Sequence, residues 1–282
     1  MRYQKFQPSS ELIPFIECYY VWEGETNGRL DVESPPSSYS AIVFNYGDPT
    51  WAYQHSANLE EVPDAFVAGM FTSIYHRVLD GKIGMAAIVF KPTALHNFFG
   101  LRMSQLVNNR MALEHLLGST ATHLYEKIKN ENTDAGRIRI LEKIISPLVP
   151  HAKTQLSIID EAIEYIDELN GISTVDEVAS KLKISKRYLE KKFLEKVGLS
   201  PKFYSRIKRF SVLANKAVHA EKINWQDVIF ESGLHDQSHL VKEYIEFNKM
   251  NPSDYYDSHN EMIKYVKPEP TLPSKKEDIE KE

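Results

Sequence analysis

Two histidines stand four residues apart in the stretch ESGLHDQSHLVKEY, residues 231–244. On one continuous helix, His235 and His239 would share a face, which is the spacing found in many zinc sites. A second feature with chemical potential is basic. Residues 181–216 contain twelve Lys and Arg and two acidic residues, a net charge of +10 in a chain of net charge −5. Such a block is typical of a phosphate-binding surface, and a solvated helix face is the alternative.

The elements that must position these residues form an internal repeat. Residues 174–201 and 224–252 share landmarks 51 residues apart, which are Ser185 and Asp236, Leu189 and Leu240, Phe193 and Tyr244, and Pro201 and Pro252. Each unit predicts two helices joined by a tight turn, with apolar stripes at helical spacing. A short second helix with a polar first turn is the kind that enters a DNA major groove. Residues 203–220 between the units predict one connecting helix.

The repeat answers the question about the histidines. Gly233 suits the end of one helix, and Asp236 suits the N-cap of the next, as Ser185 does in the first unit. His235 then lies before the helix and His239 is its third residue, so the two rings do not share a helical face. With no HExxH motif and no third ligand at suitable spacing, the sequence predicts no metal and no cofactor.

The rest of the chain predicts an α+β fold. Residues 39–49, 64–80 and 81–92 have the composition of strands bounded by Gly and Pro, and helical spacing begins after Pro92. We expect a linker at 150–155, helices from Leu156 onward and a disordered tail at 261–282. A single cysteine, Cys18, fits a reducing cytoplasm, and the sequence shows neither a secretory signal nor a membrane-spanning run.

Residues 156–256 resemble the DNA-binding domain of AraC-type bacterial transcription regulators. The motifs that carry the resemblance are SKRYLEKKF, GLSPKFY, GLHDQSHLVKEY and NPSDYY. The resemblance implies a seven-helix module with two helix-turn-helix units that bind successive major-groove segments. Carried over by position, the base-reading candidates are Arg187, Glu190, Lys191, Gln237, Ser238 and Lys242. The phosphate-contact candidates are Lys186, Lys192, Arg206, Arg209 and His239, each with a packing role as the alternative, and for Arg209 the two roles are equally open.

This sequence departs from the family pattern at two turns. Lys183 and Lys249 stand where glycines are usual, and a left-handed lysine costs on the order of 1 kcal/mol. The second unit is also acidic, because residues 217–260 hold three Lys and eight acidic residues. We therefore expect the first unit to dominate the affinity for DNA.

The N-terminal half resembles the sensor domains of one subgroup of these regulators, through YYVWEG, IVFNYGDP, VAGMFTS and AIVFKPTALHNFFGL. This resemblance implies a cupin-like β-barrel followed by helices. Aromatic candidates for an effector pocket are Tyr46, Trp51, Tyr53, Phe71, Tyr75 and Phe90, each with a core role as the alternative. The isolated histidines of this half argue against a metal-holding cupin enzyme.

The interpretation is a cytoplasmic, sequence-specific transcription regulator rather than an enzyme. Residues 1–150 would bind a small-molecule effector or dimerise, and residues 151–260 would bind double-stranded promoter DNA. RNA polymerase and a second copy of the chain are further candidate partners. The alternative keeps the DNA-binding part, but gives the N-terminal part only a dimerisation or docking role without a ligand. An alkyl-transfer enzyme would need a reactive cysteine in a basic setting, and Cys18 lies in an apolar run beside Glu17.

Overall fold

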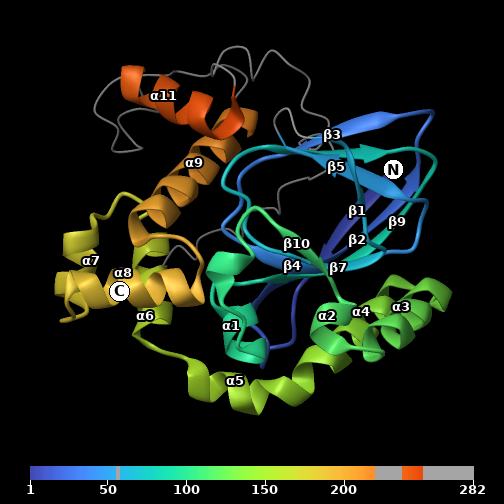
Figure 1. Cartoon of the computed structure of the whole chain (residues 1–282), viewed down its shortest axis with the longest axis horizontal. Helices are drawn as coiled ribbons and strands as arrows, with labels where there is room; N and C mark the ends of the chain where they lie inside the picture. The colour runs from blue at the N-terminus through green and yellow to red at the C-terminus, as the bar shows by residue number, and fades with distance from the viewer. Residues whose placement is uncertain (55–57, 220–236, 250–282) are drawn as a thin grey trace, which may run out of the picture.

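The computed structural model of the chain describes residues 1–54, 58–219 and 237–249, which form an α+β fold (Figure 1). The strands are β1 Arg2–Phe6, β2 Ile16–Glu25, β3 Leu30–Ser34, β4 Ser40–Asn45, β5 Thr50–Tyr53, β6 Glu60–Val62, β7 Ala65–Ala68, β8 Tyr75–Leu79, β9 Lys82–Phe90 and β10 Arg110–Ala112. The helices are α1 Ala94–Phe99, η1 Met103–Gln105, α2 Glu114–Leu117, α3 Thr120–Asn130, α4 Asp134–Ile145, η2 Ser146–Leu148, α5 Val149–Gln155, α6 Ile158–Glu168, α7 Val175–Lys181, α8 Lys186–Lys196, α9 Pro201–His219 and α11 Gln237–Asn248.

The strands form two antiparallel sheets. The larger has the order β1-β2-β9-β4-β7-β10, and the smaller has the order β3-β8-β5-β6. The predicted α+β class is confirmed, but the expected closed barrel is wrong. Among the described strands, those of the smaller sheet pair only with one another, so both sheets remain open and face each other as a sandwich.

The central strands of the larger sheet are covered on both faces. Tyr19 and Val21 of β2 pack into the cluster formed with the helices α1–α5, whereas Trp22 packs against Val32 and Leu79 of the smaller sheet. Because both faces are buried, β2 and β9 have nearly continuous apolar sequences instead of alternating ones. The strands predicted at 39–49, 64–80 and 81–92 correspond to β4, to β7 and β8, and to β9.

The linker expected at 150–155 is also wrong, because this segment is helix α5. Pro150 lies in the first turn of α5, where proline fits because that N–H has no partner within the helix. Val149 and Ala152 are buried in the same apolar cluster as α1. Pro150 therefore belongs to the start of a helix and not to a linker.

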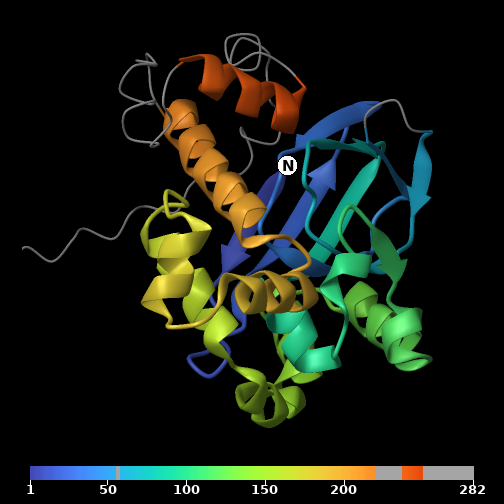
Figure 2. The same cartoon turned by 60° about the vertical axis from the view of Figure 1, so that its left-hand side comes forward.

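The described C-terminal part is helical. Residues 203–219 of the predicted connecting helix lie in α9, and α11 lies across the far end of α9 (Figures 1 and 2). Leu189, Phe193, Tyr204, Tyr244 and Phe247 form its core. None of the described helices combines the length and apolar character required to cross a membrane. The tail at 261–282 lies outside the described residues.

Candidate nucleic-acid interface

Helices α7 and α8 form the first helix-turn-helix unit. Thr174 and Glu177 form a capping box at the start of α7, and Ser185 caps α8 by accepting a hydrogen bond from the amide of Tyr188 at 3.2 Å. The turn between the helices contains Lys183 with φ of 54°. The predicted cap and the predicted left-handed lysine are both confirmed.

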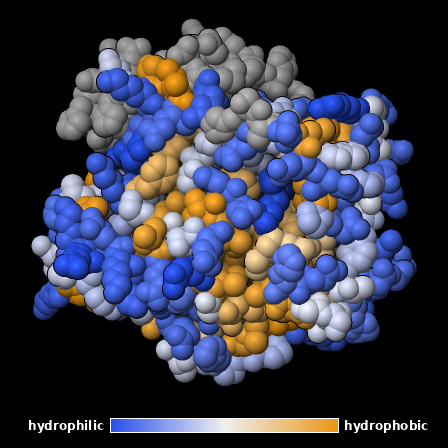
Figure 3. Space-filling view, in the orientation of Figure 1, coloured by the Kyte–Doolittle hydropathy of each residue, from blue (hydrophilic) through white to orange (hydrophobic). Residues whose placement is uncertain are grey.

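The inward face of α8 buries Leu189 and Phe193 as expected. The opposite face carries Arg187, Glu190 and Lys191, all exposed to solvent. Hydrophilic side chains dominate the surface over α7 and α8 on the face shown in Figure 3. The structure thus places the three base-reading candidates of the first unit together on one free helix face.

Two exposed side chains of α8 were missed at the sequence level. Tyr188 is 45% exposed and Leu194 is 48% exposed, and both belong to residue types that usually turn inward. Leu194 follows Arg187 and Lys191 by two turns and one turn, so it shares their face. Tyr188 adjoins Arg187 at the start of the helix. The sequence did contain a signal for them. Residues 186–196 hold more large apolar side chains than the inward-facing Leu189 and Phe193 account for.

The phosphate candidates of α8 have partial intramolecular partners. Lys186 lies 3.1 Å from Asp176 with both side chains exposed, and Lys192 lies 2.8 Å from Glu195. Exposed pairs of this kind contribute about 1 kcal/mol or less. Both lysines therefore remain free to exchange a carboxylate for a DNA phosphate.

Lys196 belongs to the same basic block but does not face solvent. Its ammonium donates to the backbone carbonyl of Gln155 at 2.7 Å and lies 3.4 Å from the amide oxygen of Asn97 in α1. Burial lowers the pKa of Lys196. Two residues later, Gly198 has φ of 90°, and a side chain there would meet the carbonyl oxygen of Met103. The C-terminal end of α8 is therefore seated against the N-terminal half.

The second unit is described in part. Helix α11 begins at Gln237, its Ser238 and Lys242 are exposed, and Tyr244 is buried. The side chains of Gln237, His239 and Leu240 lie outside the described part, as do the whole of Gly233, His235 and Asp236. At the far end, Lys249 has φ of 61°, which confirms the second left-handed lysine.

Arg206 and Arg209 of α9 point towards α11. Glu243, which is 2% exposed, accepts from Arg206 at 3.0 Å and from Arg209 at 2.7 Å, while Glu246 binds Arg206 at 2.5 Å. The hydrogen bond with Glu246 raises the pKa of Arg206. These pairs join the connecting helix α9 to α11. They also hold two of the eight acidic residues of this unit in internal contacts.

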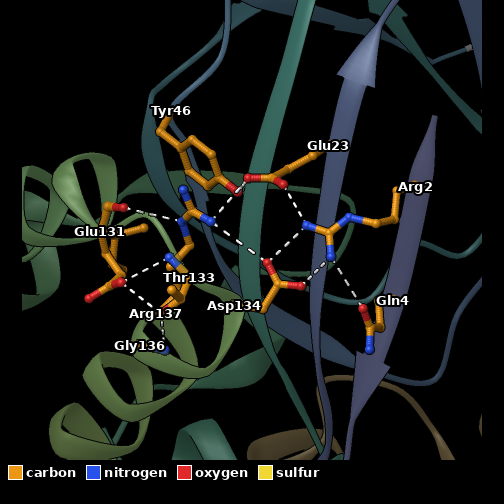
Figure 4. A network of polar contacts seen from close by, with 10 residues as sticks. Arg2, Gln4, Glu23, Tyr46, Glu131, Thr133, Asp134, Gly136 and Arg137 are labelled. Atoms are coloured by element: carbon orange, nitrogen blue, oxygen red, sulfur yellow. Dashed lines mark hydrogen bonds and ion pairs between the residues drawn. The ribbon is translucent and has the colours of Figure 1, made fainter.

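The aromatic pocket candidates lie in separate places. Tyr46 donates to Glu23 at 3.0 Å and lies beneath the guanidinium of Arg137, in a polar network between the larger sheet and α4 (Figure 4). Phe90 is fully buried in the core with α1. Tyr53 stacks on His76 at 4.4 Å on the outer face of the smaller sheet. Trp51 lies two residues before Tyr53 on the same face.

Phe71 and Tyr75 are brought together. Their ring centroids are 4.2 Å apart, and the guanidinium of Arg110 lies over both rings at 4.8 and 5.0 Å. Tyr75 also lies near Arg77, an arginine on β8 that is only 8% exposed. The sequence-level search missed Arg77 and Arg110, although a charge at an inward position of an otherwise apolar strand was visible in YHRVL. Across the described residues, no group of three His, Cys, Asp or Glu is placed to hold a metal ion.

Comparisons with known proteins identify the C-terminal part. Residues 178–258 match the family model described as a helix-turn-helix domain, and residues 4–112 match a domain of unknown function (DUF6597). No protein of curated function matches the chain.

Among solved structures, ToxT from Vibrio cholerae O395 is similar over 85% of this chain and 96% of its own, with 11% identity and a TM-score of 0.44. A ToxT structure described as bound to an unsaturated fatty acid gives 10% identity over 83% and 97% of the two chains, with a TM-score of 0.42. The AraC-like transcriptional activator CuxR gives 16% identity over 82% and 98%, with a TM-score of 0.28. These scores describe distant likenesses.

Proposed function

Because the chain carries a helix-turn-helix domain of the AraC type, we propose that it is a sequence-specific transcription regulator whose N-terminal part controls DNA binding in response to a small-molecule effector. The observation that carries the DNA-binding part is α8. It combines a capped first turn, a buried Leu189 and Phe193 stripe, and a free face with Arg187, Glu190 and Lys191. Arg and Lys address guanine, and Glu accepts from cytosine, so this face has the chemistry to read bases.

The second reading helix is α11, with Gln237, Ser238 and Lys242 as base-reading residues and His239 near the backbone. Ion pairs between α9 and α11 support a fixed spacing between the two helices, as reading successive groove segments requires. Since Arg206 and Arg209 are engaged by Glu243 and Glu246, we assign them to packing and leave Lys186 and Lys192 as the phosphate contacts.

Control by the N-terminal half is supported by a shared core. Met70 and Ile74, from the segment between β7 and β8, are buried in the same cluster as Phe193 and Phe247. The amide of Ile74 donates to the carbonyl of Phe247 in α11 at 2.8 Å. A shift of this segment therefore acts directly on the second reading helix. The alternative, an N-terminal half that only dimerises or docks a partner, keeps the same DNA interface.

The test is selection of duplexes from a random-sequence pool with the full chain, followed by footprinting. We expect an enriched sequence with two protected major-groove segments about 10 base pairs apart. Arg187→Ala should relax base preference in one segment only, and Lys127→Ala on the exposed face of α3 is the matched control. Absence of any enriched sequence, or unchanged preference in Arg187→Ala, would contradict the assignment.

A further inference from the structure

The interior of the sandwich contains two apolar clusters and a buried arginine. One apolar cluster contains Trp22, Val32 and Met85, and another contains Val43 and Phe66. Tyr20 packs against both clusters, and Arg77 lies beside it. An arginine in such a place is costly unless an opposite charge accompanies it.

No carboxylate in the described part of the chain forms an ion pair with Arg77 or with Arg110. The guanidinium of Arg77 donates to the thioether sulfur of Met85 at 3.1 Å, a weak acceptor, and lies near the phenol groups of Tyr20 and Tyr75. Arg110 enters from β10, and its guanidinium lies over the Tyr75 ring at 5.0 Å from the centroid. The charge of Glu60 reaches Arg110 only from beyond ion-pair distance. Two guanidinium groups thus lie beside one tyrosine side chain.

Further evidence comes from two neighbours of this group. The indole N–H of Trp22 is buried and has no hydrogen-bond partner among the described residues. Trp22 is the register partner of Met85, which touches Arg77. Burial raises the pKa of Tyr75, but Arg77, Ser34 and Arg110 outweigh that effect and hold the pKa below its ordinary value. The surroundings therefore favour negative charge at the Tyr75 oxygen.

From these contacts we infer that the sandwich interior binds an organic carboxylic acid, with its carboxylate between Arg77 and Arg110 and its apolar body among the neighbouring aromatic side chains. The inference rests on the proposed effector control and names the chemical class of the effector. A carboxylate matches the planar fork of a guanidinium. In the free protein, the Tyr75 hydroxyl takes the place of a carboxylate oxygen. The half-buried Arg110 connects this position with the surface.

The segment 69–75 connects this site with the helix-turn-helix part. Phe71 and Tyr75 lie against Arg110, whereas Met70 and Ile74 are buried in the core of the helix-turn-helix part. A carboxylate that displaces the Tyr75 hydroxyl shifts the residue next to Ile74, whose amide is bonded to α11. Binding of the acid is thereby coupled to the position of the second reading helix.

The experiment measures the thermal midpoint of the full chain with benzoate, octanoate or inorganic phosphate, and with benzamide and octanamide as uncharged controls. We expect benzoate or octanoate to raise the midpoint by about 2 °C or more at saturation, and the amides to have no effect. Arg77→Met and Arg110→Met should abolish the response. Arg139→Met, an exposed arginine on α4, should retain it.

If Arg77→Met fails to fold, Arg77→Lys replaces it, because lysine keeps the positive charge and lacks the planar guanidinium. Tyr75→Phe removes the internal competitor and should strengthen carboxylate binding several-fold. The inference is overturned if neither acid exceeds its amide, if phosphate alone responds, or if Arg110→Met responds as the parent chain does. DNA affinity is measured separately without ligand, so a failure of acid binding with intact DNA binding leaves the proposed regulator standing.

Discussion

Glu243 offers the sharpest test of how the two helix-turn-helix units are joined. Its carboxylate is 2% exposed and accepts from Arg206 at 3.0 Å and Arg209 at 2.7 Å, and the two arginine side chains are 22% and 15% exposed. Glu243→Gln keeps the shape but leaves both guanidinium groups without their shared counter-charge. Removal of one partner from a buried ion pair costs about 3 to 5 kcal/mol. We expect about 3 kcal/mol, because the amide oxygen still accepts a hydrogen bond.

The matched control is Glu246→Gln. Glu246 binds the same Arg206 at 2.5 Å, but its side chain is 48% exposed, so solvent screens the pair. Its loss should cost about 1 kcal/mol or less.

Hydrogen exchange of peptides from α9 and α11 provides the assay, because it reports the local opening free energy of these helices without global unfolding. A loss of about 3 kcal/mol corresponds to roughly a hundredfold faster exchange at 1.4 kcal/mol per factor of ten. Exchange in peptides from β2 and β9 should stay unchanged in both variants. Equal, small effects of Glu243→Gln and Glu246→Gln would refute the view that Glu243 holds the two units together.

Four further predictions address the turn, the DNA affinity, its salt dependence and pH. Lys183→Gly should stabilise the first unit by about 1 kcal/mol in urea unfolding, because glycine relieves the positive φ, whereas Lys183→Ala retains the strain and should change little. Lys191→Ala should weaken DNA binding by fluorescence anisotropy more than Lys242→Ala does, and equal losses would contradict the dominance of the first unit. If the protein contacts four to six phosphates, a plot of the logarithm of the DNA association constant against the logarithm of salt concentration should have a slope of about −4 to −5. A flat response would argue against DNA binding. The hydrogen bond from Arg206 lowers the pKa of Glu246, so its stabilisation is present above about pH 4.3 and is lost as pH falls through the lower folded-state pKa. In Glu246→Gln, that part of the acid dependence of α11 exchange should disappear.

The acidity of the second unit shows where counting residues was insufficient. The count of eight acidic residues against three lysines suggested repulsion from DNA. The structure commits Glu243 and Glu246 to arginines of α9, so these two carboxylates do not act as free charges. The expected dominance of the first unit in DNA affinity stays a prediction. The difference in free charge between the two units is smaller than the residue count suggested.

The pocket prediction shows a different limit. Aromatic residues were chosen by type, and the structure distributes them between the helical core, the outer face of one sheet, the Arg137 network and the Arg110 group. Periodicity assigns a residue to a face of a strand. It does not reveal which residues of distant strands meet across the sandwich, and the Arg77 and Arg110 group depends on that meeting.

The sequence by itself determined the helix-turn-helix units. Their signals are local, because caps such as Ser185, stripes such as Leu189 and Phe193, and left-handed turns such as Lys183 depend on residues a few positions apart. Only the tertiary structure decided that the sheets stay open, that Lys196 is buried against α1, and that Met70 and Ile74 enter the core around Phe247. Those features join residues that are distant in the chain, and their free energy comes from burial and charge pairing that exist only after the chain has folded.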